Sequence, residues 1–280
     1  MNDIDTSIGV SKTPSDLNSL MSAEMIRKVQ ERTPARLFVD RAGASYRTFT
    51  QLELRQDHAA AVDAVHAEFD LIEDLGEAFV QQWGLFEVHT LATSKVEFLM
   101  RPDRGRRLHD LAKAEITRQC SSGKEFQVVI GDGLSASAVK QQVPHLLPLL
   151  QEGALAKGWS TGQPFFARHC RVGVMNDIGE LLRPEVLVLL IGERPGLATA
   201  ESLSAYMAFR PAPAHNDANR NLISNIHSRG VPCETAAHRI LALATKMRML
   251  GNSGVTVKEA VANHSSDTVA FMGRSASDGT

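Results

Sequence analysis

The chain has 280 residues, of which 43% are hydrophobic and 22% are charged, and its formal net charge is −2 at pH 7. This average composition excludes disorder throughout and allows one large core or two small ones. With a net charge close to zero the chain has no excess of positive charge that would attract the phosphate backbone of a nucleic acid, so we expect no nucleic-acid partner. Residues 1–20 lack a basic flank followed by an apolar core, and the longest aliphatic run, at 186–191, is too short to cross a membrane. We therefore expect a cytoplasmic protein without a membrane partner.

The three cysteines, Cys120, Cys170 and Cys233, are widely spaced and include no CxxC pair. An odd number without paired spacing indicates buried free thiols rather than a disulfide framework or a structural zinc site. The sequence also contains no GxSxG elbow, P-loop or HExxH motif, so nothing supports the common hydrolase, NTPase or zinc-protease classes. We therefore predict no metal site and no catalytic residue in this chain.

Four regions follow from the distribution of residue types. Residues 1–30 and 263–280 are predicted flexible tails, because both ends are polar and lack periodic apolar positions. Residues 31–119 form a predicted N-terminal helical region, and residues 120–262 form a predicted α/β domain.

Within the helical region, interruptions at Pro34 and Gly43 predict at least two helices that form an N-terminal arm. Residues 96–100 predict a short strand. Pro102 then predicts the first turn of a helix that runs to about residue 120, because proline is favoured at the start of a helix.

The second region alternates apolar runs with helical stretches. A helix after Ser135 is punctuated by Pro144, and a last helix ends at Gly251. The run at 186–191 is apolar at every position, which suits a strand that is covered on both faces. The predicted fold class is α/β, with a mostly parallel Rossmann-like sheet flanked by helices and a helical N-terminal arm. Its predicted strands are residues 126–130, 165–170, 186–191 and 203–209.

The loop at residues 131–136 reads GDGLSA and fits the pattern G-x-G-x-x-A between a strand and a helix. Such glycines let backbone N–H groups approach a pyrophosphate, so a nicotinamide-dependent oxidoreductase is one alternative. That class needs an acidic residue at the end of the second strand, where this chain has Arg171. A tight turn at the end of a strand explains the glycines equally well.

Other polar groups lie at positions where ligands bind. Glu193 and Arg194 follow the most apolar strand, at the edge where open α/β sheets bind ligands, although a salt bridge within the loop would also explain the pair. His227 has no evident partner, so a structural role is expected. A cluster at 101–107 contains four arginines, which could clamp a phosphate or a carboxylate or could face solvent or a subunit.

Five strings, in this order and at this spacing, resemble the small (light) chain of ethanolamine ammonia-lyase. The similarity covers about residues 33–251, and five ordered strings are far more specific than a single glycine motif. The strings are RPDRGRRL at 101–108, QVVIGDGLS at 127–135, GERPGL at 192–197, ESLS at 201–204 and ISNIH at 223–227.

The resemblance implies a two-chain carbon–nitrogen lyase that converts ethanolamine to acetaldehyde and ammonia. It implies base-on adenosylcobalamin between this chain and a larger barrel-shaped subunit, in an assembly of six pairs. It further implies that homolysis of the cobalt–carbon bond gives an adenosyl radical, which abstracts hydrogen from substrate held in the large subunit. By this resemblance the cofactor-binding residues are Val172, Glu193 and Leu222, and Leu222 stands where other members carry cysteine.

Cobalamin enzymes that replace the cofactor's own base use a D-x-H-x-x-G loop, and no Asp in this chain has His two residues later. Base-on binding therefore follows if cobalamin binds. Two alternatives stay open, namely a nicotinamide oxidoreductase that uses Gly131 and Gly133, and a non-catalytic scaffold of a bacterial microcompartment. Some family members enter such compartments through an amphipathic extension, but residues 1–20 lack a convincing apolar stripe, so packaging also stays open.

Overall fold

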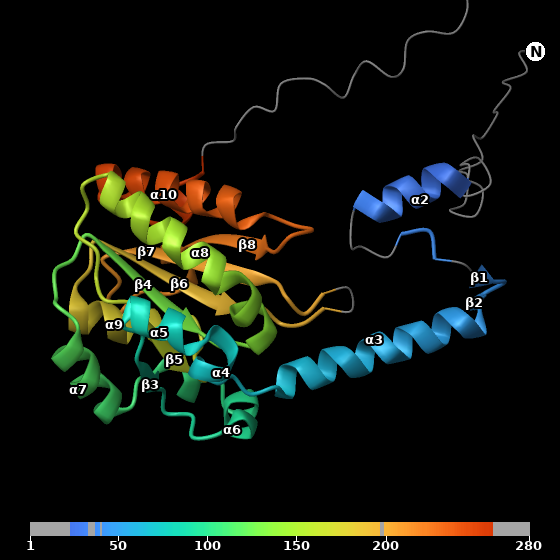
Figure 1. Ribbon diagram of the computed structural model, residues 1–280, viewed down its shortest axis with the longest axis horizontal. Helices are drawn as coiled ribbons and strands as arrows, with labels where there is room; N and C mark the ends of the chain where they lie inside the picture. Colours follow the sequence, from blue (N-terminus) through green and yellow to red (C-terminus); the bar gives the residue numbers. More distant parts are fainter. Residues whose placement is uncertain (1–22, 33–36, 40, 197–198, 260–280) are drawn as a thin grey trace, which may run out of the picture.

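The computed structural model describes residues 23–32, 37–39, 41–196 and 199–259. These residues form an α/β body with a helical arm on its N-terminal side (Figure 1). The architecture confirms the predicted fold class, because a mostly parallel sheet is flanked by helices.

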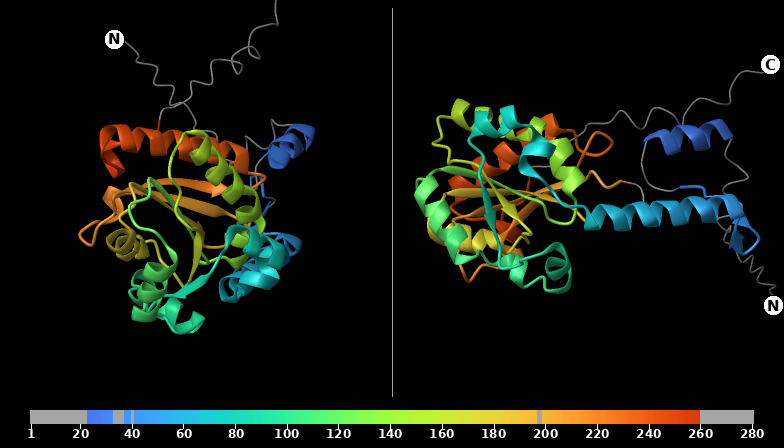
Figure 2. Two further views of the ribbon diagram at one scale, coloured as in Figure 1. Left: turned by 60° about the vertical axis from the view of Figure 1, so that its left-hand side comes forward. Right: turned by 60° about the horizontal axis from the view of Figure 1, so that its bottom comes forward.

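The arm contains two helices with a small hairpin between them. Helix α3 (Thr48–His66) projects away from the α/β body, and α2 (Ala23–Arg32) lies near its far end (Figures 1 and 2). The hairpin pairs β1 (Arg41–Ala42) with β2 (Ser45–Tyr46), and Gly43 adopts a φ of +64° in the turn. The predicted break at Gly43 is therefore present. Most of the two predicted tails, and Pro34, lie outside the described residues.

Six strands form the central sheet in the order β3-β5-β4-β6-β7-β8. The first four run parallel, whereas β7 is antiparallel to β6 and β8 is antiparallel to β7. The aliphatic runs predict β4 to β7 but do not predict β3 or β8. The bounds are β3 Glu87–His89, β4 Phe126–Gly131, β5 Phe165–Arg168, β6 Val186–Gly192, β7 Leu203–Phe209 and β8 Asn221–Ile226.

Two hydrophobic layers enclose the sheet. Helices α8 (Ala136–Ala156) and α10 (Cys233–Leu250) cover one face, and α7 (Asp110–Gln119) and α9 (Val174–Leu182) cover the other (Figure 2). Every residue of β4 and β6 is buried, as expected for strands that are covered on both faces. The remaining helices are α4 (Leu71–Leu75), α5 (Glu77–Trp83), α6 (Lys95–Met100) and the 3-10 turns η1 (Arg104–Arg106), η2 (Asp217–Asn219) and η3 (Gly254–Thr256).

The predicted strand at 96–100 is wrong, because these residues form most of helix α6. Ser94 caps this helix, since its hydroxyl oxygen accepts a hydrogen bond from the backbone N–H of Glu97 at 3.2 Å. The carboxylate of Glu97 in turn accepts from the backbone N–H of Thr93 at 2.9 Å. An apolar run of five residues does not distinguish a helix from a strand, so these capping contacts decide the outcome.

Two helix boundaries also differ from the prediction. The helix expected to start at Pro102 is divided into η1 and α7, and α7 is capped by His109, whose Nδ1 accepts from the N–H of Leu111 at 3.2 Å. Helix α8 continues through Pro144 and Pro148, because its buried face packs on the sheet and offsets the backbone hydrogen bonds that the prolines lack. Strand β3 joins the sheet from the region that the sequence predicts to be helical.

Candidate functional site

A hollow of about 330 Å³ opens where β4, β5 and β6 end. The loop after β4 leads to α8 on one face of the sheet, whereas the loop after β5 leads to α9 on the other face. Open α/β sheets bind ligands at such a switch point. We call this cavity the strand-end hollow, and strands β7 and β8 complete its wall. Its lining includes Leu134, Val172, Glu193, Tyr206, Leu222 and Ser224.

All three predicted cofactor-binding residues line the strand-end hollow. Val172 follows β5, Glu193 follows β6 directly, and Leu222 lies on β8 beside its cross-strand partner Tyr206. Leu222 is 46% exposed, so it presents apolar surface to the hollow even though its side chain cannot donate a hydrogen bond. Residues that are 50 positions apart in the chain, such as Val172 and Leu222, are thus brought to one cavity.

The carboxylate of Glu193 is held in place by three donors. The hydroxyl of Ser202 donates to Oε2 at 2.7 Å, and the hydroxyl of Ser204 donates to Oε1 at 2.6 Å. The backbone N–H of Asn225 also donates to Oε1, at 2.9 Å. An ionised carboxylate accepts about four hydrogen bonds, so Oε2 keeps capacity for a ligand. Within the described part of the chain Glu193 and Arg194 form no ion pair, and a loop salt bridge does not explain them.

The two glycines at the end of β4 are packed closely against other parts of the chain. A Cβ on Gly133 would lie 2.4 Å from the carbonyl oxygen of Gly192, and a Cβ on Gly131 would lie 2.1 Å from the sulfur of a buried cysteine. The start of α8 is also covered, because the hydroxyl of Ser137 donates to the carbonyl of Ala200 at 2.9 Å. Close packing at a tight turn therefore explains these glycines without a dinucleotide.

A second hollow, of about 420 Å³, adjoins the first and shares Arg171, Val172 and Tyr206 with it. It lies beside the start of α9, whose N-cap is Gly173. We call it the polar hollow, because charged and hydrogen-bonding side chains dominate its lining. These are Arg106, Arg107, Arg171, Asn176, Asp177, His215, Asn216, Asp217 and Arg220.

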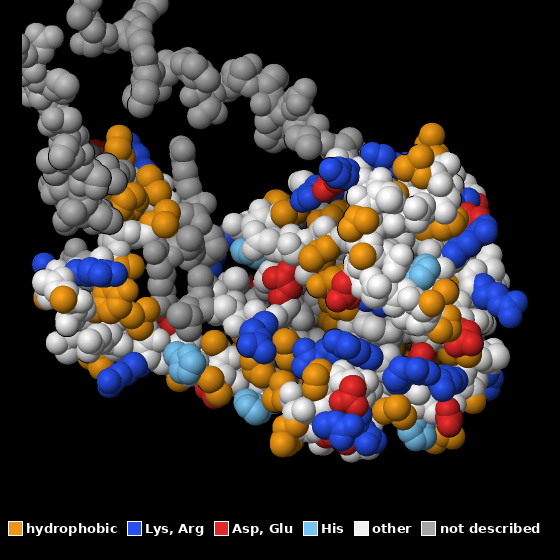
Figure 3. All heavy atoms as spheres, turned by 180° about the vertical axis from the view of Figure 1, so that it is seen from behind, with side chains coloured by type: hydrophobic (Ala, Val, Ile, Leu, Met, Phe, Trp, Pro, Cys, Tyr) orange, Lys and Arg blue, Asp and Glu red, His pale blue; other side chains and the backbone are white. Residues whose placement is uncertain are grey.

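Three of the four arginines at 101–107 pair with carboxylates of the chain itself. Arg106 differs, because it forms no ion pair with the described residues and lines the polar hollow instead. Figure 3 shows basic side chains gathered on the lower part of the α/β body, with acidic side chains among them. The pairs are Arg101 with Asp103 at 2.8 Å, Arg104 with Glu97 at 3.0 Å and Arg107 with Asp177 at 3.0 Å.

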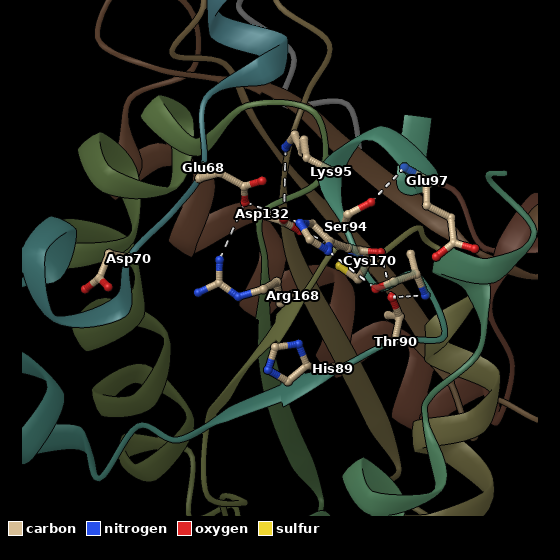
Figure 4. Close-up of polar contacts among 12 residues, drawn as sticks. Glu68, Asp70, His89, Thr90, Ser94, Lys95, Glu97, Asp132, Arg168 and Cys170 are labelled. Carbon is tan, nitrogen blue, oxygen red and sulfur yellow. Dashed lines mark hydrogen bonds and ion pairs between the residues drawn. The ribbon is translucent and has the colours of Figure 1, made fainter. Parts of the chain in front are cut away.

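A largely buried polar cluster lies where β4 and β5 end (Figure 4). Lys95 on α6 reaches within 4.0 Å of the carboxylate of Asp132, which follows β4, and that carboxylate accepts from the backbone N–H of Cys170 at 3.1 Å. Burial raises the pKa of the Asp132 carboxyl, and the charge of Lys95 opposes the rise. Arg168 at the end of β5 lies 3.7 Å from Glu68 at the base of the arm. The cluster thus ties together the loops that shape the hollow.

His227 has the structural role that the sequence predicts. Its ring is buried, and Nε2 lies 2.8 Å from Oδ1 of Asn225. Asn225 has a φ of +61°, so the ring supports a strained position of β8. Burial lowers the pKa of His227, which keeps the ring neutral at pH 7. His227 lines neither hollow.

Other features of the described residues do not indicate chemistry. A larger hollow of about 690 Å³ lies between β3 and α7, at the outer edge of the sheet, and shares no residue with the other two. No cluster of three His, Cys, Asp or Glu residues that could hold a metal ion occurs in the described ranges. No helix in that part combines the length and apolar character that a bilayer crossing requires. All three cysteines are free and buried, as predicted.

Comparison with known proteins identifies the family. The profile described as ethanolamine ammonia-lyase light chain (EutC) matches residues 23–258. The chain belongs to this family. The small subunit of ethanolamine ammonia-lyase from Clostridium perfringens is 39% identical over 235 residues, which are 84% of this chain and 78% of that protein. The small subunit from Fusobacterium nucleatum is 39% identical over 243 residues, covering 87% and 80%, and that from Clostridioides difficile is 39% identical over 236 residues, covering 84% and 78%.

Within this light chain, sequence reasoning does not identify the groups that hold Glu193. Ser202, Ser204 and Asn225 belong to the ESLS and ISNIH strings that carry the family resemblance, but the strings alone assign them no role. A signal is present at the start of β7, because hydroxyl groups occupy position 202, directly before the strand, and position 204 within it. Alternate residues share one face of a strand, so this pattern indicates a polar site on that face.

Proposed function

We propose that this chain is the small subunit of an adenosylcobalamin-dependent ethanolamine ammonia-lyase and that its strand-end hollow holds one side of base-on cobalamin. The observation that carries the proposal is the convergence of Val172, Glu193 and Leu222 on one hollow at the switch point of the sheet. The relatives are named small subunits, which supports a partnership with a large subunit. The family resemblance further supports an assembly of six pairs in the cytoplasm.

The lining of the hollow fits a corrinoid. Leu134, Ile191 and Leu222 provide apolar surface for the ring, and Glu193 provides an acceptor for the N–H groups of the peripheral amides. A cavity of about 330 Å³ lies at the small end of the range for drug-sized ligands, whereas cobalamin is much larger. This chain can therefore cover only part of the cofactor. We propose that the large subunit covers the rest and holds ethanolamine.

When bound, adenosylcobalamin supplies the radical that starts the conversion of ethanolamine to acetaldehyde and ammonia. The residues of this chain then contribute by holding and orienting the cofactor. Leu222 and Val172 exclude water from their side of the cofactor, and Glu193 orients a peripheral amide through a charge-assisted hydrogen bond. Because Ser202 and Ser204 fix the carboxylate of Glu193, little conformational freedom is lost when the amide binds.

The proposal is tested by replacing Glu193 in the co-purified two-chain complex. We expect Glu193→Ala to weaken cobalamin binding by about tenfold to a hundredfold, since a hydrogen bond to a charged group contributes about 1.5 to 3 kcal/mol. Glu193→Gln is expected to cost less, because its amide can keep the contacts to Ser204 and Asn225 and a corrin amide can turn its carbonyl toward the new N–H. Equilibrium dialysis followed by cobalamin absorbance measures both affinities.

Glu201→Ala is the matched control, because Glu201 is an exposed carboxylate in the same loop and lines neither hollow. We expect this variant to bind cobalamin like the wild type. An unchanged dissociation constant for Glu193→Ala, in a complex that assembles normally, removes Glu193 from the site. A wild-type complex that retains no cobalamin contradicts the proposed function as a whole.

A further inference from the structure

Three arginines line the region where the two hollows adjoin. Arg171 lines both hollows, Arg106 lines the polar hollow, and Arg194 lines the strand-end hollow. Within the described residues none of the three forms an ion pair with a carboxylate, unlike Arg101, Arg104 and Arg107 nearby. We call this group the arginine junction.

The fold holds two of these side chains in place. Arg171 follows β5, its guanidinium stacks 4.2 Å above the ring of Phe98, and its backbone N–H donates to the carbonyl of Gly105 at 2.7 Å. Arg106 packs along the backbone of Gly173, where an added Cβ would lie 2.9 Å from the Arg106 side chain. These contacts hold the aliphatic parts of the Arg106 and Arg171 side chains, while neither guanidinium group forms an ion pair with a described carboxylate.

Such an arrangement is unfavourable without an anion. Burial lowers the pKa of Arg171, and the positive charges of Arg194 and Arg106 lower it further. Like charges that are held together in a partly buried place repel each other more strongly than they would in water. An anion at the junction would remove this repulsion and could accept hydrogen bonds from the guanidinium groups.

The polar hollow also contains buried polar atoms without a hydrogen-bond partner. Among the described residues, six buried side-chain nitrogen or oxygen atoms lack a hydrogen-bond partner, and three of them belong to residues that line this hollow. They are Nε of Arg171, Nδ1 of His215 and Nε of Arg220. The side chain of Arg220 is only 5% exposed. Buried polar atoms are normally paired, so their concentration here indicates a ligand rich in oxygen atoms.

We propose that the arginine junction and the polar hollow bind the phosphodiester and ribose of the nucleotide tail of cobalamin, beside the strand-end hollow that contacts the corrin ring. This inference rests on the proposed function. The tail carries the phosphodiester of the cofactor, and in the base-on form it folds back beneath the corrin. A phosphate and a sugar must then lie next to the ring, as the polar hollow lies next to the strand-end hollow. Planar guanidinium groups match phosphate oxygens in geometry and charge.

The test compares two corrinoids on the purified two-chain complex. Hydroxocobalamin carries the complete nucleotide tail, whereas cobinamide lacks its phosphate, ribose and benzimidazole. We expect Arg106→Gln to bind hydroxocobalamin about tenfold more weakly than the wild type and to bind cobinamide with unchanged affinity. Arg101→Gln is the matched control, because it removes a positive charge from the same segment but lines neither hollow. We expect no change for either corrinoid in this control.

Several outcomes would overturn the inference. If Arg106→Gln weakens both corrinoids equally, or neither, the junction does not bind the tail. If it reduces recovery of the complex instead, Arg106 contacts the partner chain. If wild-type cobinamide binding is too weak to measure, the salt dependence of hydroxocobalamin binding is compared instead. The inference requires this dependence to be smaller in Arg106→Gln than in the wild type, and an equal dependence contradicts it. A wild-type complex that binds neither corrinoid contradicts the proposed function and is thereby distinguishable from these results.

Discussion

Cys120, Cys170 and Cys233 lie in the hydrophobic layers on the two faces of the sheet. Burial raises the pKa of Cys120 to about 11, and it also raises the pKa values of Cys170 and Cys233. A thiol reacts as its thiolate, and with a pKa of about 11 roughly one molecule in a thousand is ionised at pH 8. Packing therefore suppresses the reactivity of these cysteines.

We expect the folded chain to react with a disulfide reagent such as DTNB only on the timescale of unfolding. Three thiols should appear at once after denaturation, since the sequence contains three cysteines. The measurement is the absorbance of the released thiolate at pH 8, with and without denaturant. A thiol that reacts within seconds in the native complex would show that one of the three sites is open.

Glu193 illustrates what can be predicted for a single residue. Its position after an aliphatic strand is visible in the sequence, and the structure places it at the strand-end hollow. Its partners are not visible, because Ser202 and Ser204 reach it only through the antiparallel return of β7, in which Gly192 pairs with Leu203. The sequence thus predicts where this side chain lies but not why its carboxylate is held rigidly.

At the level of elements, buried strands and the last helix are predictable because their apolar periods are long and continuous. Strand β8 is missed, because its outward residues are exposed and an irregularity in its pairing with β7 disrupts the alternation. Strand β3 is missed because it has only three residues. Short elements depend on tertiary contacts, and no local pattern encodes those contacts.

The contact between Lys95 and Asp132 links two such elements, α6 and the loop after β4. We expect Lys95→Met alone, and Asp132→Asn alone, each to lower the free energy of unfolding by about 3 kcal/mol, because each leaves a buried polar group without its partner. The double variant should lose clearly less than the sum of the two, since both charges are then removed together. Urea unfolding of the four proteins measures the coupling. Additive losses would show that Lys95 and Asp132 act independently.

At the scale of the whole molecule, contacts among the described residues do not explain why the long helix of the arm, α3, is stable. Helix α3 spans 19 residues and buries none of them, although Phe49 is 70% exposed and Leu52 is 57% exposed. Figure 3 shows hydrophobic side chains on the arm, and Figure 1 shows that α3 projects away from the body. Helices in proteins depend mainly on packing of an apolar face. We therefore expect α3 to pack on the large subunit.

A double variant, Phe49→Ser with Leu52→Ser, tests this expectation. Burial of a Phe or Leu side chain contributes about 1.5 to 3 kcal/mol, so assembly with the large subunit should weaken by at least about tenfold. The thermal unfolding of the isolated small chain should stay nearly unchanged, because neither side chain is buried within it. Leu155→Ser is the matched control, since Leu155 is a comparably exposed leucine, at 60%, near the far end of α8. Analytical ultracentrifugation of the mixed chains gives the association constants. If the arm variant and Leu155→Ser weaken association with the large subunit equally, the effect does not depend on where the exposed side chain lies. If the arm variant assembles as well as the wild type, α3 does not pack on the large subunit.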